Sequence, residues 1–432
     1  METKLERITQ LSKENPDMVF TSIGHFINVD MLRNCHEKMD KDKAVGIDGI
    51  TKEEYSQRLD ENLAELIERM KKKSYHPKPA RRVEIPKDNG KTRPLSIYCY
   101  EDKLVQEALK RVLEAVFEPH FYNEMMGFRP NRGCHDALRL LNSQIYCKTS
   151  WILDADIKSF FDNIDHEWIM KFVGARIKDP RILRLVRIML KAGVVKDLGD
   201  YEPTERGSGQ GSVCSPILSC IYMHYVLLWW FHEIVKPMLK GSAGIVNYAD
   251  DFVVCFQYKE EAELFYKLLR RRMAHFGLSL AEDKCRLIEF GSFAANNRRR
   301  RNEGKSETFD FLGFTHICSV TKNGKFGVRR KTSRKKFAKK CKEMHKKIGL
   351  LRTRKTVDII KWVNQVLIGY YHYYGVVGNY DRVIAFRWNV LKSLFYWLNR
   401  RSQKKSYTWK GFYDMVDKVH PVVRPKTSYV YI

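Results

Sequence analysis

Residues 245–256 read IVNYADDFVVCF, and this stretch decides how the middle of the chain folds. Its two ends are rich in residues that favour strands, and an acidic pair separates them. We therefore predict a hairpin whose tip presents Asp250 and Asp251 to a cleft. An aspartate pair in an ordinary turn is usually just solvated. The aromatic residue before this pair and the apolar strand directly after it favour a functional role instead.

A third carboxylate is expected from residues 151–166, which read WILDADIKSFFDNIDH. Asp154 and Asp156 alternate on a predicted strand, so both point to the same face. A buried strand rarely carries an uncompensated carboxylate, and an acid there implies a metal ion or a basic partner. Asp165 is expected to cap a helix that begins at His166.

Carboxylates gathered from two strands fit the chemistry of nucleotidyl transfer. Two divalent ions about 4 Å apart activate an attacking 3′-oxygen and stabilise a leaving pyrophosphate. Hard ions such as Mg²⁺ take carboxylate and carbonyl oxygens as ligands. The two stretches therefore predict a site for two metal ions.

The charge of the chain points to a polyanionic partner. The 432 residues carry a formal net charge of +27, with a pI near 9.6. Nucleic acid is the leading candidate, because Lys and Arg make most phosphate contacts. A basic protein without that function, such as a ribosome-associated factor, is the alternative.

The cysteines and the apolar segments restrict the class further. Ten cysteines are scattered without a C-x-x-C pair, which argues against a zinc ribbon. With a polar N-terminus and no disulfide framework, the cytoplasm is the expected location. Residues 213–231 are the most apolar stretch, but Pro216 and His224 interrupt it. We interpret it as a buried helix and expect no membrane span.

The order of predicted elements gives an outline of the chain. Residues 1–75 and 101–118 favour helices, and residues 81–97 favour short strands around an Asn89-Gly90 turn. Helices at about 165–190 and 214–236 separate the two acidic strands, which predicts a mixed sheet covered by helices. Residues 294–307 are polar and charged, so we expect an exposed loop. After about residue 325 the chain becomes strongly basic and then rich in long apolar helices.

Several motifs, taken in order, resemble those of a known family. WILDADIKSFFDNIDH, RGSGQGSVCSPILSCIY, NYADDFVVCF, GLSLAEDKCRLIEF and FDFLGF are similar to the successive palm motifs of reverse transcriptases. KAVGIDG, KTRPLSI and GFRPNRGCHDAL resemble the N-terminal and fingers motifs of the group II intron-encoded subfamily. The resemblance covers roughly residues 40–415.

The resemblance implies an α+β, right-hand polymerase fold with fingers, a mixed α/β palm and a helical thumb. The expected divisions are an N-terminal extension with the start of the fingers, fingers, palm, a helical thumb or domain X, and a short tail. They span residues 1–80, 81–150, 151–325, 326–415 and 416–432.

The resemblance also assigns the catalytic and nucleotide-binding residues. Asp156, Asp250 and Asp251 would be the metal ligands, with the carbonyl of Ile157 completing a shell for two Mg²⁺ ions or substituting Mn²⁺. Phe161 would be the steric gate that selects deoxynucleotides, although a core phenylalanine is the alternative. The remaining residues expected around the deoxynucleoside triphosphate are Lys91, Arg93, Gln210, Gly211 and Lys284.

A second set of residues is expected to bind the primer and template. Leu312 and Gly313 resemble the primer-grip hairpin, and Arg129 and Arg132 would contact template phosphates. The basic residues that would contribute from the start of the thumb are Arg329, Arg330, Lys335 and Lys336.

The function implied by the resemblance is RNA-directed DNA polymerisation by a group II intron-encoded protein. Its partners would be an RNA template, a DNA primer and the intron RNA, whose splicing and retrohoming it would assist. The chain stops soon after the thumb, so target cleavage by an endonuclease domain is not expected. The alternatives are a maturase that binds RNA with its polymerase unused, or a domesticated enzyme in phage defence or DNA repair. The sequence leaves the oligomeric state open.

Overall fold

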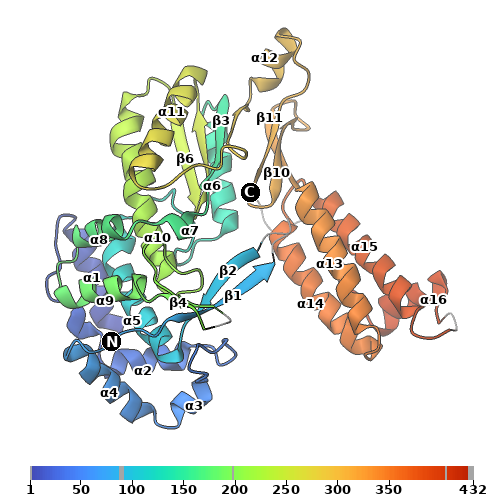
Figure 1. The fold of residues 1–432 in the computed structure, drawn as a ribbon. Coiled ribbons are helices and arrows are strands. Elements are labelled where there is room, and N and C mark those ends of the chain that lie inside the picture. Colours follow the sequence, from blue (N-terminus) through green and yellow to red (C-terminus); the bar gives the residue numbers. More distant parts are fainter. Residues whose placement is uncertain (1, 87–91, 197–198, 404–405, 427–432) are drawn as a thin grey trace.

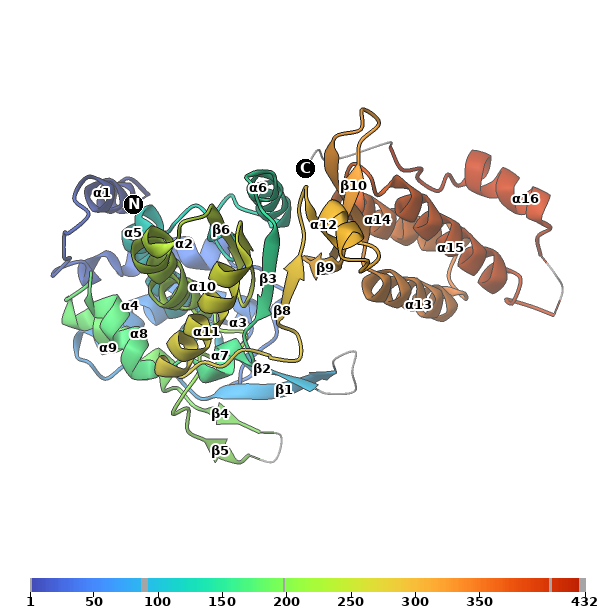
Figure 2. The same cartoon turned by 90° about the horizontal axis from the view of Figure 1, so that it is seen from above.

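The computed structural model describes residues 2–86, 92–196, 199–403 and 406–426. The chain forms a large body of helices and sheets, with a separate bundle of C-terminal helices beside it (Figure 1). A small sheet lies between the two parts, as the view from above shows (Figure 2). Among the described residues, no helix combines the length and apolar character that crossing a membrane requires.

The central sheet, which we call the palm sheet, carries both acidic stretches. Its four strands run in the spatial order β6-β7-β3-β8. All three pairings are antiparallel, so the expectation of a mixed sheet was wrong. The long helical connection between β3 and β6 returns the chain so that β7, the second arm of the hairpin, lies against β3. The strands are β3 (Trp151–Asp156), β6 (Ala243–Tyr248), β7 (Asp251–Phe256) and β8 (Arg286–Glu289).

The two faces of the palm sheet pack against different layers. Leu153 and Val254 point into the main core with α10 and α11, whereas Ile152 and Val253 pack against α6. This alternation is what a strand covered on both sides produces. Asp165 accepts hydrogen bonds from the first turn of α8, which confirms the predicted cap.

The helices of the body cover the palm sheet and form its base. The long predicted helices at 59–70 and 101–118 are present as α4 and α5. Residues 224–235 continue α10 as two π-helical segments, η3 and η4. The helices and short turns of the body are α1 (Glu2–Glu14), η1 (Gly24–Phe26), α2 (Val29–Lys38), α3 (Lys52–Ser56), α4 (Leu59–Lys71), α5 (Tyr100–Phe117), η2 (Glu118–His120), α6 (Cys134–Tyr146), α7 (Phe160–Asn163), α8 (His166–Gly174), α9 (Pro180–Leu190), α10 (Ser215–Met223), η3 (His224–Trp229), η4 (Phe231–Val235), η5 (Lys236–Met238), α11 (Lys259–His275) and α12 (Ala294–Arg300).

A second sheet extends from the base of the body and matches the expected fingers strands. Strands β1 (Ala80–Pro86) and β2 (Thr92–Ile97) pair antiparallel, and the predicted Asn89-Gly90 turn lies outside the described residues. Strand β1 also pairs in parallel with β4 (Val194–Val195), which is followed by β5 (Tyr201–Glu202).

The C-terminal part is a helical bundle with its own core. Its helices are α13 (Arg334–Leu351), α14 (Thr356–Tyr374), α15 (Tyr380–Leu398), α16 (Trp409–Asp414) and η6 (Met415–Val419). The linking sheet consists of β9 (Thr308–Phe311), β10 (Phe314–Val320) and β11 (Phe326–Thr332). The predicted start of the thumb at residue 326 coincides with the first residue of β11, the second strand of the β10–β11 hairpin.

One predicted loop is partly helical. Residues 294–300, expected to be an exposed loop, form the short helix α12. The side chain of buried Glu289 accepts hydrogen bonds from Asn297 and Arg301, and these contacts tie the segment to the end of β8. The sequence pattern gave no sign of these partners.

Candidate active site

The acidic turn between β6 and β7 lies at the end of the palm sheet. Tyr248 pairs with Asp251, and Asp251 pairs with Asp156 of β3 in the sheet register. Three carboxylates from two distant stretches therefore meet at one edge. Ala249 adopts a left-handed conformation with φ of 58°, which turns the chain tightly enough to place Asp250 at the tip.

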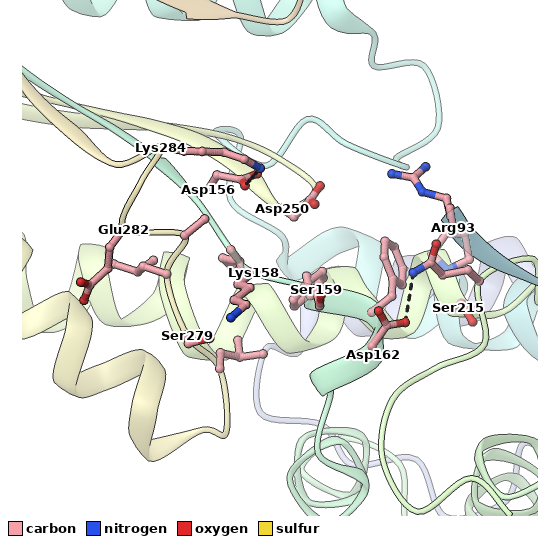
Figure 3. A pocket seen from close by; sticks show the side chains of 18 of the residues that line it. Arg93, Asp156, Lys158, Ser159, Asp162, Ser215, Asp250, Ser279, Glu282 and Lys284 are labelled. Carbon is pink, nitrogen blue, oxygen red and sulfur yellow. Dashed lines mark hydrogen bonds and ion pairs between the residues drawn. The ribbon is translucent and has the colours of Figure 1, made fainter. Parts of the chain in front are cut away.

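A cavity of about 1370 Å³ opens in front of this turn. Asp156 and Asp250 lie at its upper edge and Arg93 faces them from β2, as Figure 3 shows. Lys158 and Ser279 extend the cavity below them. Asp251 is partly buried and does not line the cavity. The cavity thus presents two carboxylates of the acidic site, Asp156 and Asp250, to a ligand, and further acids and several cations line the rest of its wall.

Burial and mutual repulsion disfavour the ionised form of the turn carboxylates. Burial raises the pKa of Asp251 well above its usual value, and the negative charges of Asp154, Asp156 and Asp250 raise it further. Burial likewise raises the pKa of Asp250, with Asp156 adding to the shift. Clustered carboxylates of this kind require a positive countercharge to remain ionised at neutral pH.

Lys284 supplies part of that countercharge. Its ammonium lies 2.5 Å from the Asp156 carboxylate (Figure 3), and this hydrogen bond raises the pKa of Lys284. Lys284 follows the turn after α11, so 128 residues separate the partners in sequence. The contact joins Asp156, which the sequence predicts to be a metal ligand, to Lys284, which it predicts to bind the nucleotide.

The donor set has the chemistry of a site for hard divalent cations. Carboxylates that repel one another and point toward open space are the ligands that Mg²⁺ prefers. In the described part of the chain, however, no group of three or more His, Cys, Asp or Glu side chains is arranged to hold a metal ion. Asp156 is instead paired with Lys284. A metal site is therefore a proposal from the donor chemistry.

Ile157 follows Asp156 in the chain and lines the same cavity. Its amide donates a hydrogen bond to the carbonyl of Asp250, with N and O 3.2 Å apart. In an extended strand the N–H and C=O of one residue point to the same side. The Ile157 carbonyl therefore lies on the side of the acidic turn, as the predicted ligand role requires.

Asp154 is a titratable residue whose environment the sequence did not reveal. Its side chain is largely buried, and burial raises its pKa to about 7. The guanidinium of Arg286, 3.9 Å away, opposes this shift, while Asp310 and Asp156 add to it. Asp154 is thus a buried acid beside the catalytic candidates. The positive charge of Arg286 offsets only part of the cost of burying its carboxylate.

Replacing Asp154 with asparagine is expected to stabilise the protein at alkaline pH. The native pKa lies above the unfolded value of about 4, so the native state gains stability from this group only at low pH. That stability is lost as pH rises from about 4 to 7. Without divalent ions, D154N should raise the free energy of unfolding at pH 8 by on the order of 2 kcal/mol. Urea denaturation at pH 8 and pH 4.5 measures the change, which should shrink at the lower pH.

The exposed Asp60 provides the control for this prediction. Asp60→Asn removes the same charge from a highly basic chain without changing a buried group. An equal gain in D60N and D154N, or a gain in D154N that does not depend on pH, would contradict the assignment of a raised pKa to Asp154.

The predicted nucleotide residues surround the same cavity. Arg93, Phe161, Gln210, Gly211 and Lys284 all line it. The amide of Gln210 donates to the Asp162 carboxylate over 3.0 Å (Figure 3). Lys91 lies outside the described residues.

The loop that carries Gln210 is fixed against the fingers sheet. The Ser96 amide donates to the Gln210 carbonyl at 2.7 Å. Gly211 has a φ of 115°, and a Cβ there would meet the Ser96 carbonyl oxygen at 2.5 Å. Only glycine fits this close backbone approach. Gly211 therefore has a packing role in addition to lining the cavity.

Phe161 is one of the aromatic residues that line the cavity. It is partly buried and meets Phe128 edge to face, with ring centroids 6.0 Å apart. Phe160 is 2% exposed and packs in the main core, as expected, although it also contributes to the wall of the cavity. Phe128 was not identified from the sequence, yet it lines the cavity and is 47% exposed. Its positive φ of 61° was not apparent from residue type.

The predicted primer-grip turn connects β9 to β10 in the linking sheet and contacts α14 of the helical bundle. Leu312 and Gly313 both have positive φ, at 48° and 79°. The hydroxyl of Tyr373 in α14 donates to the Leu312 carbonyl at 2.9 Å, and the Ser333 amide donates to Gly313. The turn is therefore held from the thumb side.

Two arginines predicted to contact nucleic acid are buried, and the prediction is corrected for both. Arg129 forms an ion pair with Glu118 at 2.8 Å and donates to the carbonyls of Tyr122 and Met125. Arg330 is 2% exposed and donates to Asn142 of α6. Each guanidinium is occupied by partners inside the protein, so neither is available to a phosphate.

The other predicted nucleic-acid residues are accessible to different degrees. Lys335 and Lys336 are exposed at the start of α13. Arg329 is half-buried and pairs with Asp381 at 3.1 Å. Arg132 is half-buried and donates to Asn123. These four remain candidates for phosphate contacts.

Comparisons with known proteins agree with the geometry. Residues 85–316, just over half of the chain, match the family model described as reverse transcriptase (RNA-dependent DNA polymerase). The chain is 36% identical over 222 residues to the group II intron-encoded protein LtrA of Lactococcus lactis, covering 51% of this chain and 37% of that protein. It is 34% identical over 238 residues to protein YkfC of Escherichia coli, covering 48% and 62%.

A further similarity extends over most of the chain. An uncharacterized 91 kDa protein in the cob intron of Schizosaccharomyces pombe is 26% identical over 465 residues, covering 90% of this chain and 55% of that protein. The chain thus spans between 37% and 62% of the length of these relatives.

Proposed function

This chain belongs to the reverse transcriptase family, and from that premise we propose that it is an RNA-directed DNA polymerase encoded by a group II intron-like element. The observation that carries the proposal is the meeting of Asp156 with the Asp250-Asp251 turn at the edge of one cavity. The likeness to LtrA supports the assignment to an intron-encoded protein.

The reaction would join a primer 3′-hydroxyl to a deoxynucleotide and release pyrophosphate. Bound divalent cations would lower the pKa of the attacking hydroxyl and neutralise charge on the transferred phosphate. Asp156, Asp250, Asp251 and the Ile157 carbonyl would hold these cations. Burial raises the pKa values of Asp250 and Asp251, and a bound cation would favour their ionised forms, so cation binding should strengthen as pH rises.

Lys284 would act on the leaving group. The hydrogen bond to Asp156 raises its pKa and keeps it protonated at neutral pH. A protonated ammonium at the cavity wall is a suitable proton donor and counterion for departing pyrophosphate.

The remaining cavity residues would hold the incoming nucleotide. Arg93 faces the carboxylates across the cavity and is exposed, so its fork of donors is free to grip phosphate oxygens. Phe161, which lines the cavity, would block a ribose 2′-hydroxyl. Gln210 and Gly211 would line the site between nucleotide and template.

Intron RNA and the primer–template duplex are the proposed partners. The net charge of +27 and the exposed lysines of α13 support phosphate binding. Assistance with splicing would use the same basic surface to bind intron RNA and would not require Asp156, Asp250 or Asp251. Catalytic and splicing functions should therefore separate on mutation.

Primer extension is the direct test. The purified chain, with an RNA template, an annealed DNA primer and deoxynucleoside triphosphates, should extend the primer only when Mg²⁺ or Mn²⁺ is present. Chelation with EDTA should stop extension, and added Mg²⁺ should restore it. A chain that binds the duplex but leaves the primer unextended with either ion would refute the polymerase proposal and leave an RNA-binding role.

A further inference from the structure

The catalytic turn is supported from behind by a segment outside the palm sheet. Residues 124–127 run alongside the end of β6, and Met125 forms a parallel bridge with Asn247. The Asn247 amide donates to the Glu124 carbonyl at 2.9 Å, and the Met126 amide donates to the Asn247 carbonyl at the same distance. The last residues of β6 are therefore bonded on both edges.

Asn247 is a polar side chain in an apolar position. It is 1% exposed and shares its face of β6 with Ile245, which lies in the main core. Its cross-strand partner is Phe252, also fully buried. A buried amide at such a position requires a hydrogen-bond partner, because burial without one is unfavourable.

The partner is the backbone of the catalytic turn. The side-chain amide of Asn247 donates to the carbonyl of Ala249 over 2.8 Å. Ala249 is the left-handed residue of the turn, and its carbonyl belongs to the peptide that leads into Asp250. On the other side of Asp250, its own carbonyl accepts from the Ile157 amide at 3.2 Å. Both peptide groups that flank the Asp250 side chain are thus anchored.

Gly127 packs directly against the catalytic turn. A Cβ on Gly127 would lie 2.5 Å from the Ala249 nitrogen, so the backbone of residues 124–127 touches the turn directly. The Gly127 carbonyl in turn accepts from the buried thiol of Cys220. The turn therefore rests against a packed wall and has little freedom to relax if its hydrogen bond is lost.

We propose that Asn247 is a positioning residue that orients the Asp250 carboxylate toward the cavity by holding the Ala249 carbonyl. The inference rests on the proposed polymerase function and deepens it. Asn247 itself touches neither substrate nor cation. Its role is to fix the direction of a carboxylate that must meet a metal ion within tenths of an ångström.

Two variants separate the hydrogen bond from the packing. Asn247→Ala removes the amide and leaves space, whereas Asn247→Leu keeps the branched shape and the number of heavy atoms without a donor. If the hydrogen bond positions Asp250, both should lower kcat about 10- to 100-fold. The KM values for nucleotide and primer–template should stay within about threefold of wild type, since binding contacts are unchanged.

A second readout follows the cation without turnover. Binding of Mn²⁺ alone, followed by electron paramagnetic resonance, should weaken by about tenfold in both variants. The matched control is Thr149→Val, which removes one buried hydrogen bond, to the Gln144 carbonyl, at the opposite end of the palm sheet. T149V should lose a similar amount of thermal stability and retain wild-type kcat and Mn²⁺ affinity.

The outcomes are distinguishable. Wild-type kcat and Mn²⁺ affinity in N247L would overturn the inference and leave Asn247 as a packing residue. Equal losses in N247L and T149V would also overturn it, since general destabilisation would then explain both. A wild-type chain that fails to extend primers would count against the polymerase proposal alone, because Mn²⁺ binding would still compare N247L with wild type.

Discussion

Asp250→Asn is expected to reduce primer extension by at least about a thousandfold while the protein stays folded. Asparagine keeps the size of the side chain but loses the charge that a bound cation needs, and metal ligation contributes several kcal/mol to the transition state. The pKa of Asp250 is raised by burial, so its ionised form does not stabilise the native state. The melting temperature of D250N without metal should equal or exceed that of wild type. Single-nucleotide incorporation and thermal unfolding measure the two effects.

Asp42→Asn is the matched control for D250N. Asp42 is an exposed acid that does not line the cavity, so the variant removes the same charge without changing the site. D42N should retain extension within about threefold of wild type. Residual activity in D250N above a few per cent of wild type would contradict the assignment of Asp250 as a metal ligand. Retained RNA binding by D250N would show that catalytic and binding roles separate.

Phe161→Ala is expected to lower discrimination against ribonucleotides about a hundredfold. Phe161 lines the cavity, and Phe128 contacts its ring edge to face. Removing it opens space for a 2′-hydroxyl, and steric rejection of a single group accounts for discrimination of this order. The measurement is the ratio of kcat/KM for dGTP and GTP opposite a template cytidine.

A variant of the neighbouring Phe160 distinguishes loss of a steric gate from a general loss of core packing. Phe160 is 2% exposed and lies in the main core, so Phe160→Leu should lower the melting temperature and leave sugar discrimination unchanged. If F161A kept its preference for dGTP, or if F160L lost it, Phe161 would be a core residue and the gate would lie elsewhere.

The sequence predicted the features that depend on local pattern. The strands that carry the acidic residues, the cap at Asp165 and the long amphipathic helices each follow from spacing within a few turns of chain. The meeting of Asp156 with Asp251 was predicted because the motifs, taken together, resemble a known fold.

The features that the sequence did not predict depend on partners distant along the chain. Arg129 and Arg330 look like exposed cations in their segments, but Glu118 and Asn142 meet them in the folded state. The ion pair between Lys284 and Asp156 likewise joins residues on different elements. The only local signal for Asn247 was a polar residue where strand alternation calls for an apolar one.

The contact between Ser96 and the loop at Gln210 and Gly211 has a consequence for engineering. The two segments share a backbone hydrogen bond, and Gly211 approaches the Ser96 carbonyl so closely that a Cβ would not fit. Their shapes are therefore complementary to within the width of a methyl group. A chimaera that imports the β1–β2 hairpin from a relative should therefore import residues 207–212 from the same donor. Directed evolution of one segment alone should accumulate compensating changes in the other.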